Sequence, residues 1–222
     1  MSAVMITEEM LAALRKDVGT RLSEYRMAHT LGVEAMAVEL AALYCPEKTM
    51  LLRAAALLHD VTKELSDEEQ LRILLDHGVT LRQDERDCPQ IWHAITAPIA
   101  IAERYAPFAL VEVIAAVRWH ATGRAEMTLT EALVYLADYI ERGRTHGDCV
   151  AVRDTFFGAE PQSMPQTARN KHLRDVMLQS YEKTVGKLQG RGQGVCTDTL
   201  DAMAYLKQRT EIKRRKNGRR NL

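Results

Sequence analysis

The dipeptide His59-Asp60 is the first feature of this sequence that points to chemistry. It ends the most apolar segment of the chain, TMLLRAAALLHD over residues 49–60, which predicts a helix at the centre of a bundle. A histidine and an aspartate at the inner end of a buried helix need partners, because burying an unpaired polar group costs free energy. A divalent cation satisfies both side chains, and so does a His–Asp hydrogen bond without a metal.

Two more side chains extend this pair to a full ligand set. His29 lies within an otherwise apolar helical stretch, with Arg26 three residues before it on the same face. Asp138 interrupts the apolar stretch LVYLADYIE. Two histidines and two aspartates form a mixed nitrogen and oxygen set that suits iron, manganese or zinc. A single helical histidine is more often structural, so the prediction of a metal site rests on the four residues together.

His93 and His120 belong to the same set of candidates. They lie at or near predicted helix ends, in IWHAIT and VRWHATG. Each is a candidate ligand for a second metal or a candidate contact for a bound phosphate, and a helix-end histidine without a role is the alternative. Six His and Asp positions leave a two-metal site open, but one metal on the four-residue set is the expectation.

The elements that must position these residues are helical nearly throughout, which predicts an all-α bundle with additional C-terminal helices. Ser66 and Glu69 form a capping box at one helix start, and Thr130 is expected to cap another. Pro98 predicts a kink or a late helix start. Residues 79–89 and 158–168 read as loops. The predicted helices cover residues 7–18, 24–44, 49–60, 67–76, 90–105, 108–120, 131–142, 169–189 and 197–212.

Length and composition favour one domain, expected over residues 1–206. The chain has 222 residues, 46% of them hydrophobic, which allows a buried core. It has no apolar run of about 18 residues and no N-terminal signal sequence, so a cytoplasmic protein without a membrane partner is expected. The cysteines form no CxxC pair, which favours free thiols over a zinc ribbon. They are Cys45, Cys88, Cys149 and Cys196.

The basic C-terminal tail, residues 207–222, carries an uneven share of the charge. It holds eight basic residues and one acid, and the formal net charge of the whole chain is zero. Clustered Lys and Arg residues attract nucleic acid, so a non-catalytic module that binds nucleic acid or the ribosome is one hypothesis. A solvated helix end is the preferred interpretation, with at most weak nucleic-acid binding.

Four segments in order carry a resemblance to a known family. They are RMAHTLGVEAMAVELA, AALLHDVTKELS, WHATGRAEMTLTEALVYLADYIERGR and MLQSYEKTVGKLQGRGQGV. The order H…HD…H…H…D resembles the HD-domain superfamily of metal-dependent phosphohydrolases. The segments themselves are similar to its YqeK-type symmetrical bis(5'-nucleosyl)-tetraphosphatases, over roughly residues 20–206. The resemblance implies an HD-domain helical bundle that cuts diadenosine tetraphosphate into two ADP.

The resemblance also implies roles for individual residues. The iron-site positions match His29, His59, Asp60 and Asp138. Predicted substrate contacts match Arg26, Lys63, His93, His120, Thr122, Gly123, Asp138 and Arg144. In the implied mechanism Asp60 orients a water molecule and Lys63 reaches phosphate oxygens, with His93 and His120 as further catalytic candidates. For Arg26, a surface ion pair is an equally good interpretation.

Two departures from the family pattern bear on substrate range. Ala94 follows His93 where the family often has Gly, and Arg142 follows Ile-Glu where it often has Pro. Arg142 adds a cation near the phosphates or faces solvent. Another HD phosphohydrolase activity, on nucleoside monophosphates or cyclic nucleotides, is the nearest alternative. The oligomeric state, a homodimer included, stays open.

Overall fold

The computed structural model describes residues 5–218, with side chains described as far as residue 209. This part of the chain contains helices and turns and no strand, so the all-α prediction is confirmed. The helices are α1 (Glu8–Gly19), α2 (Glu24–Tyr44), α3 (Thr49–Leu58), α4 (Asp67–Asp76), α5 (Gln83–Arg86), α6 (Trp92–Arg104), α7 (Val111–Trp119), α8 (Leu129–Ile140), α9 (Gly147–Gly158), α10 (Gln166–Gly190) and α11 (Thr197–Gly218).

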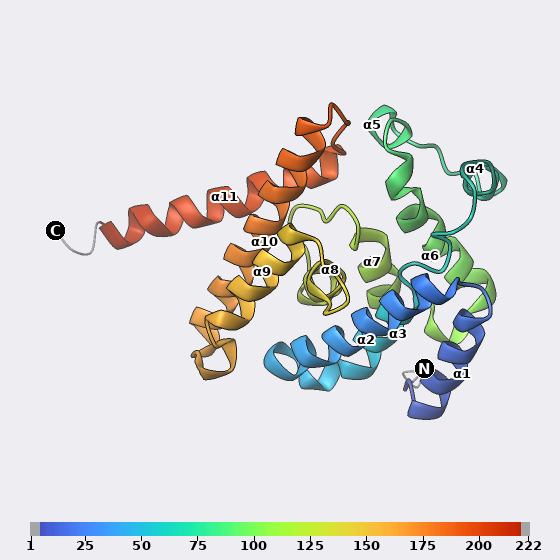
Figure 1. Cartoon of the computed structure of the whole chain (residues 1–222), viewed down its shortest axis with the longest axis horizontal. Coiled ribbons are helices and arrows are strands. Elements are labelled where there is room, and N and C mark those ends of the chain that lie inside the picture. Colours follow the sequence, from blue (N-terminus) through green and yellow to red (C-terminus); the bar gives the residue numbers. More distant parts are fainter. Residues whose placement is uncertain (1–4, 219–222) are drawn as a thin grey trace.

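Helices α3 and α8 form the centre of the molecule. Helix α3 packs against α1, α2, α7 and α8, and its run from Ala54 to Leu58 is fully buried. The three alanines in that run allow neighbouring helices to approach closely, as the apolar pattern predicts. Helix α8 lies between α7 on one side and α10 on the other (Figure 1). A smaller apolar cluster under α4 and α5 includes Leu74, Trp92 and Cys196.

Three predictions about where helices start can be compared with the structure. Ser66 and Glu69 form the predicted capping box at the start of α4. The prediction for α8 is wrong, because Thr128 caps this helix and forms the box with Glu131. Thr130 is instead buried inside the helix and donates its hydroxyl to Glu112. Pro98 lies inside α6, so the alternative of a late helix start is wrong.

Two helices were not predicted. Helix α5 is a single turn within residues 79–89, a segment that reads as a loop because its sequence, QDER, has no apolar face. Helix α9 packs on α10 and α8. Its apolar residues Cys149, Val152 and Phe156 are buried, but Val150, Ala151 and Phe157 spread apolar character around the helix and weaken the periodic signal.

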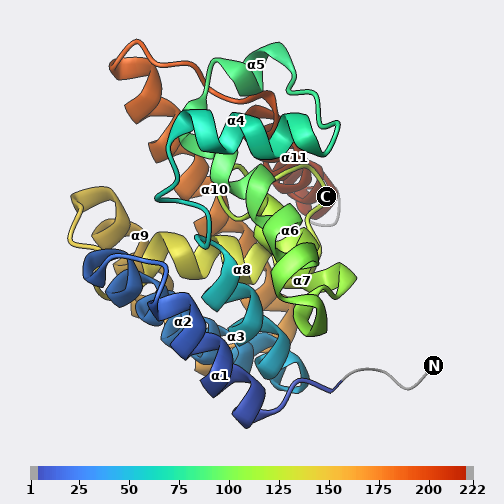
Figure 2. The same cartoon turned by 90° about the vertical axis from the view of Figure 1, so that its right-hand side faces the viewer.

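Helix α11 continues through residue 207 to Gly218, so the predicted start of the basic tail falls inside a helix. Figure 1 shows the C-terminal part of α11 projecting away from the other helices, and Figure 2 shows the same helix from its end. Residues 219–222 of the predicted tail lie outside the described residues. None of the described helices is long and apolar enough to cross a membrane.

Candidate metal centre

Five helices bring the predicted chemical residues to one place. His29 lies in the first half of α2, and Asp138 lies near the end of α8. Helix α3 ends at Leu58, two residues before its predicted end, and His59 and Asp60 directly follow it. His93 lies in α6 and His120 directly follows α7. Helices α2, α7 and α8 pack on α3, and α6 packs on α7, so residues far apart in sequence meet in a buried cluster.

The donor atoms of the predicted metal ligands fall into two overlapping groups that could hold a metal ion, His29 with His59 and Asp138, and His59 with Asp60 and His120. His29 Nε2 lies 3.0 Å from Asp138 Oδ1 and 3.8 Å from Asp60 Oδ2. His59 Nε2 lies 3.4 Å from His29 Nε2 and 3.4 Å from Asp60 Oδ2. A cation with bonds of about 2.0–2.2 Å separates neighbouring ligands by about 3.0–3.6 Å. The donor types therefore fit a divalent cation, and all of these separations except the 3.8 Å between His29 and Asp60 fall in this range.

Three of the histidines are oriented by the acceptor at their other ring nitrogen. Nδ1 of His59 lies 2.6 Å from the carbonyl oxygen of Ala56, and Nδ1 of His120 lies 2.6 Å from that of Val117. Nδ1 of His29 lies 3.2 Å from Glu141 Oε1. Because these oxygens only accept, Nδ1 of each ring carries a proton and Nε2 is the nitrogen that faces the cluster. An Nε2 without a proton then presents its lone pair to a metal.

His93 has the opposite arrangement. Lys63 Nζ donates to its Nδ1 at 3.1 Å, so a neutral His93 carries its proton on Nε2. That Nε2 lies 3.1 Å from His120 Nε2 and 3.3 Å from Asp60 Oδ1. Burial lowers the pKa of His93 well below its usual value, which keeps the ring neutral. The arrangement makes His93 a hydrogen-bond donor toward Asp60 and His120.

Glu141 is a member of the site that the sequence reading missed. It is buried, contacts His29, and accepts a hydrogen bond from the backbone N–H of Gly143 at 2.5 Å. A Cβ at Gly32 would overlap its carboxylate, so that glycine lets α2 approach Glu141. The sequence signal was the LADYIE string, which places Glu141 three residues after Asp138 on the same side.

Three cations surround the carboxylates. Arg26 donates to Asp60 Oδ2 at 2.7 Å, and Arg144 pairs with Asp138. Lys63 lies in the turn after Asp60, with Nζ 3.0 Å from the carbonyl oxygen of Gln90. Nε of Arg26 is buried and has no hydrogen-bond partner among the residues that the structure describes. A buried donor without a partner is costly, which indicates that a further acceptor binds beside Arg26.

Charge within the cluster is fixed by its neighbours. Burial alone would raise the pKa of Asp60, but His59 and His120 hold it well below its usual range. Arg144 and His29 likewise outweigh burial and hold the pKa of Asp138 low. Burial alone would lower the pKa of His29, but hydrogen bonds to Asp138 and Glu141 raise it to about 9. Both aspartates are therefore anionic at neutral pH, and His29 of the metal-free protein is protonated.

Cation binding is therefore expected to release a proton from His29. At a pH below the His29 pKa of about 9, the cation competes with that proton. The apparent affinity of the metal-free protein for Mn²⁺ should therefore fall by about tenfold for each unit by which the pH is lowered. Calorimetric titration of the metal-free protein between pH 6.5 and 8.5 measures this slope. An affinity that does not change over this range would contradict the protonated state of His29.

A cavity of about 340 Å³ opens beside the cluster. Its walls include Arg26, His29 and Arg144, together with two residues that the sequence reading did not select, Tyr25 and His146. Tyr25 is 80% exposed, which is unusual for an aromatic side chain. The cavity therefore joins an exposed aromatic ring, two arginines and one of the predicted metal ligands.

The remaining predicted substrate contacts, Thr122 and Gly123, contact the C-terminal helices. Thr122 is buried, and its carbonyl oxygen accepts a hydrogen bond from Thr199 of α11 at 3.0 Å. Gly123 packs against Tyr181 of α10. Their role as substrate contacts stays a prediction, and the contacts described here tie the segment after His120 to the C-terminal helices.

Gly123→Ala tests that packing. Gly123 has a φ of +64°, and a Cβ there would overlap the hydroxyl of Tyr181. We expect the free energy of unfolding to fall by about 3 kcal/mol, from the left-handed backbone and the overlap together. Gly192→Ala is the matched control, since its φ is +65° but nothing lies within 4 Å of the added carbon. Equal losses in denaturant unfolding of the two variants would exclude a contribution from the Tyr181 contact.

The two departures from the family pattern lie outside the cluster. Arg142 is 64% exposed and pairs with Glu39 at 2.7 Å, so it faces solvent rather than the cavity. Ala94 is fully buried in α6. Neither side chain alters the donor set of the four predicted ligands.

Comparison with known proteins agrees with the geometry. An HD-domain family model matches residues 26–143. A Bacillus subtilis protein named symmetrical bis(5'-nucleosyl)-tetraphosphatase is 30% identical over 203 residues, 91% of this chain and 98% of that protein. A Staphylococcus aureus protein of the same name is 35% identical over 74% of this chain and 86% of its own.

A solved structure supports the same assignment. It is described as a predicted HD superfamily hydrolase involved in NAD metabolism, from Clostridium acetobutylicum, and it is 29% identical with a TM-score of 0.76. The match covers 89% of this chain and 97% of that one. The resemblance inferred from the sequence is thus confirmed. This chain belongs to the HD-domain family and, within it, to the family of the symmetrical bis(5'-nucleosyl)-tetraphosphatases.

Proposed function

We propose that this protein hydrolyses diadenosine tetraphosphate symmetrically to two ADP, using one cation held by His29, His59, Asp60 and Asp138. The observation that carries the proposal is the convergence of these four donors with Arg26 and Arg144 at the edge of one cavity. The names of the relatives support the symmetrical cut. Iron is the proposed metal, with manganese and zinc as alternatives that suit the same donors.

The charges of the site suit a polyphosphate. A cation held at this cluster would neutralise phosphate oxygens and acidify a water molecule. Arg26 and Arg144 each have N–H groups within reach of the cavity, and guanidinium groups bind phosphate through paired hydrogen bonds. The unpartnered Nε of Arg26 is then satisfied by a phosphate oxygen. Tyr25, exposed at the same cavity, offers a flat surface on which an adenine ring stacks.

The bond changes are those of an anhydride hydrolysis. The oxygen of water bonds to one central phosphorus, and the bond from that phosphorus to the bridging oxygen breaks. Asp60 and Asp138, both anionic, orient the attacking water. The bridging oxygen leaves as part of ADP and takes the Nε2 proton of His93, while Lys63 passes a proton to Nδ1 so that the ring stays neutral. A proton from the attacking water then restores the Lys63–His93 pair, so the sum is one dinucleotide and one water to two ADP.

One cation is favoured over two by the tautomer of His93. A second cation between His93, His120 and Asp60 would need the Nε2 lone pair of His93, but Lys63 fixes the proton at that nitrogen. His120 does form a three-residue donor group with His59 and Asp60, but both of those residues already belong to the first site, so this group is not an independent donor set. We therefore assign His93 and Lys63 to substrate and proton handling.

Product analysis tests the proposed function. The purified protein is incubated with diadenosine tetraphosphate and added Fe²⁺ or Mn²⁺, and the products are separated by chromatography. Metal-dependent formation of ADP alone is expected. ATP plus AMP would refute the symmetrical cut. NAD serves as a second substrate because it has the same kind of bond between two nucleotides, and preferential cleavage of NAD would point to a shorter phosphate bridge.

Deleting residues 207–222 distinguishes the proposed enzyme from the alternative hypothesis of a non-catalytic module that binds nucleic acid. The donor set lies entirely within residues 29–138, so we expect kcat and KM of the shortened protein to stay within about twofold of the full-length values. Binding of a fluorescent oligonucleotide, measured at two salt concentrations, reports the basic tail separately. A large loss of turnover would show that the tail takes part in the site or the fold.

A further inference from the structure

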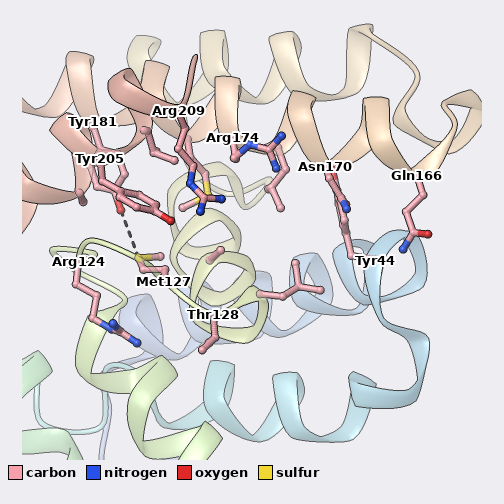
Figure 3. A pocket seen from close by; sticks show the side chains of 16 residues that line it. Tyr44, Arg124, Met127, Thr128, Gln166, Asn170, Arg174, Tyr181, Tyr205 and Arg209 are labelled. Atoms are coloured by element: carbon pink, nitrogen blue, oxygen red, sulfur yellow. Dashed lines mark hydrogen bonds between the residues drawn. The ribbon is translucent and has the colours of Figure 1, made fainter. Parts of the chain in front are cut away.

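A second cavity lies at the opposite end of α8 from Asp138. Its volume is about 290 Å³, and its walls come from α10, α11, the start of α8 and the segment before it, with Tyr44 at the end of α2 (Figure 3). None of the predicted metal ligands lines it. Asp138 lies nine residues along α8 from Leu129 at the cavity, a rise of about 14 Å. The cavity is therefore not an extension of the metal centre.

The lining of this cavity is positively charged. Arg124, Arg174 and Arg209 contribute to it, and no carboxylate does among the residues whose side chains are described. Arg124 is neutralised by Glu131 behind it, at 3.0 Å. Arg174 is half-buried and has no hydrogen bond or ion pair within the described part of the chain. Arg209 likewise has neither there, and its guanidinium group lies over the Tyr205 ring in a cation–π contact. Two cations thus face the cavity without a counter-charge.

The rest of the lining is aromatic and apolar. Tyr205 forms part of one wall, and its ring lies 5.0 Å from the guanidinium carbon of Arg209. Met127 and Met177 add flexible apolar surface, which adapts well to a flat ring. Asn170 and Gln166 place side-chain amides on the same lining. Figure 3 shows Arg174 and Arg209 reaching in from α10 and α11, across the cavity from Arg124.

We propose that this cavity binds a mononucleotide, with its phosphate at Arg174 and Arg209 and its base between Tyr205 and the methionines. Unpaired guanidinium groups favour a phosphate, and an aromatic and thioether wall favours a planar ring. A volume of about 290 Å³ lies at the lower limit for small-molecule sites, which suits one nucleotide rather than two. The proposal does not depend on the hydrolysis at the metal centre.

Binding of 5'-AMP to the metal-free protein tests the proposal. Hydrogen–deuterium exchange with saturating AMP should show protection of residues 124–132 and 170–177, which line the cavity. Arg174→Gln and Arg209→Gln should each weaken AMP binding by about tenfold, the loss expected for one charged hydrogen bond. Lys171→Gln is the matched control, because it removes a charge from the same helix at a 57% exposed position outside the cavity.

The outcomes separate this site from the metal centre. Both arginine variants should retain circular dichroism and hydrolytic turnover, since neither residue lies at the metal centre, so weaker AMP binding by a folded protein supports the proposal. Protection confined to residues around His29 and Asp138 would overturn it. Equal affinity of the arginine variants and Lys171→Gln would also overturn it, as would adenosine binding as tightly as AMP, because the arginines would then hold no phosphate.

Discussion

Asp60→Asn is expected to abolish both metal binding and hydrolysis while leaving the helical content unchanged. The two oxygens of Asp60 serve different partners: Oδ2 faces His29, His59 and Arg26, and Oδ1 faces His93 and His120. An amide replaces one oxygen with a donor and removes the negative charge that holds these groups together. Loss of the cation costs several kcal/mol of transition-state stabilisation, so kcat/KM should fall by about 10³-fold or more.

Metal content and turnover are measured on the same preparation, by elemental analysis and ADP release. Asp175→Asn is the matched control, because Asp175 is a partly exposed aspartate that pairs with Lys171 on α10. It should keep full metal content and activity. If Asp60→Asn kept its metal and full turnover, the assignment of the cluster as the metal centre would be wrong.

The sequence predicted most helices because their apolar residues recur at helical spacing. The run around Ala54–Leu58 and the string containing Asp138 are apolar almost all round, and both became central helices. The cap of α8 shows where the reading failed. Thr128 and Thr130 are equally good capping residues by type, and only Glu131, three residues after Thr128, distinguishes them. The capping-box spacing therefore marks Thr128, and not Thr130, as the start of α8.

The site was predicted as a set of residue types but not as a network. His29, His59, Asp60 and Asp138 are unusual in apolar helices, so their burial and need for partners followed from the sequence. The ring orientations of the histidines did not follow from the sequence. The partners of His59 and His120, for example, are backbone carbonyl groups whose direction depends on the fold. Tyr25 was missed for another reason. An exposed aromatic residue has no sequence signal until a cavity is known beside it.

His93→Asn is expected to leave one metal per chain and to lower kcat by about 100-fold, since loss of a positioned proton donor costs 10²–10⁴ in rate. The reason is the contact with Lys63, which places the proton of neutral His93 on Nε2, beside Asp60 and His120. A group in this state donates a hydrogen bond and does not bind a cation. The contacts among the four proposed metal ligands do not involve His93 and remain in the variant.

Metal stoichiometry and steady-state kinetics are measured together, because the two possible roles of His93 predict different metal contents but the same loss of kcat. A metal ligand and a proton donor both lower kcat when removed, but only the ligand lowers metal content. His77→Asn is the control, since His77 is a surface histidine that contacts Glu103. Two metals per chain in the wild type and one in His93→Asn would establish a second cation at His93, and the proton would then have to lie on Nδ1, against the contact with Lys63.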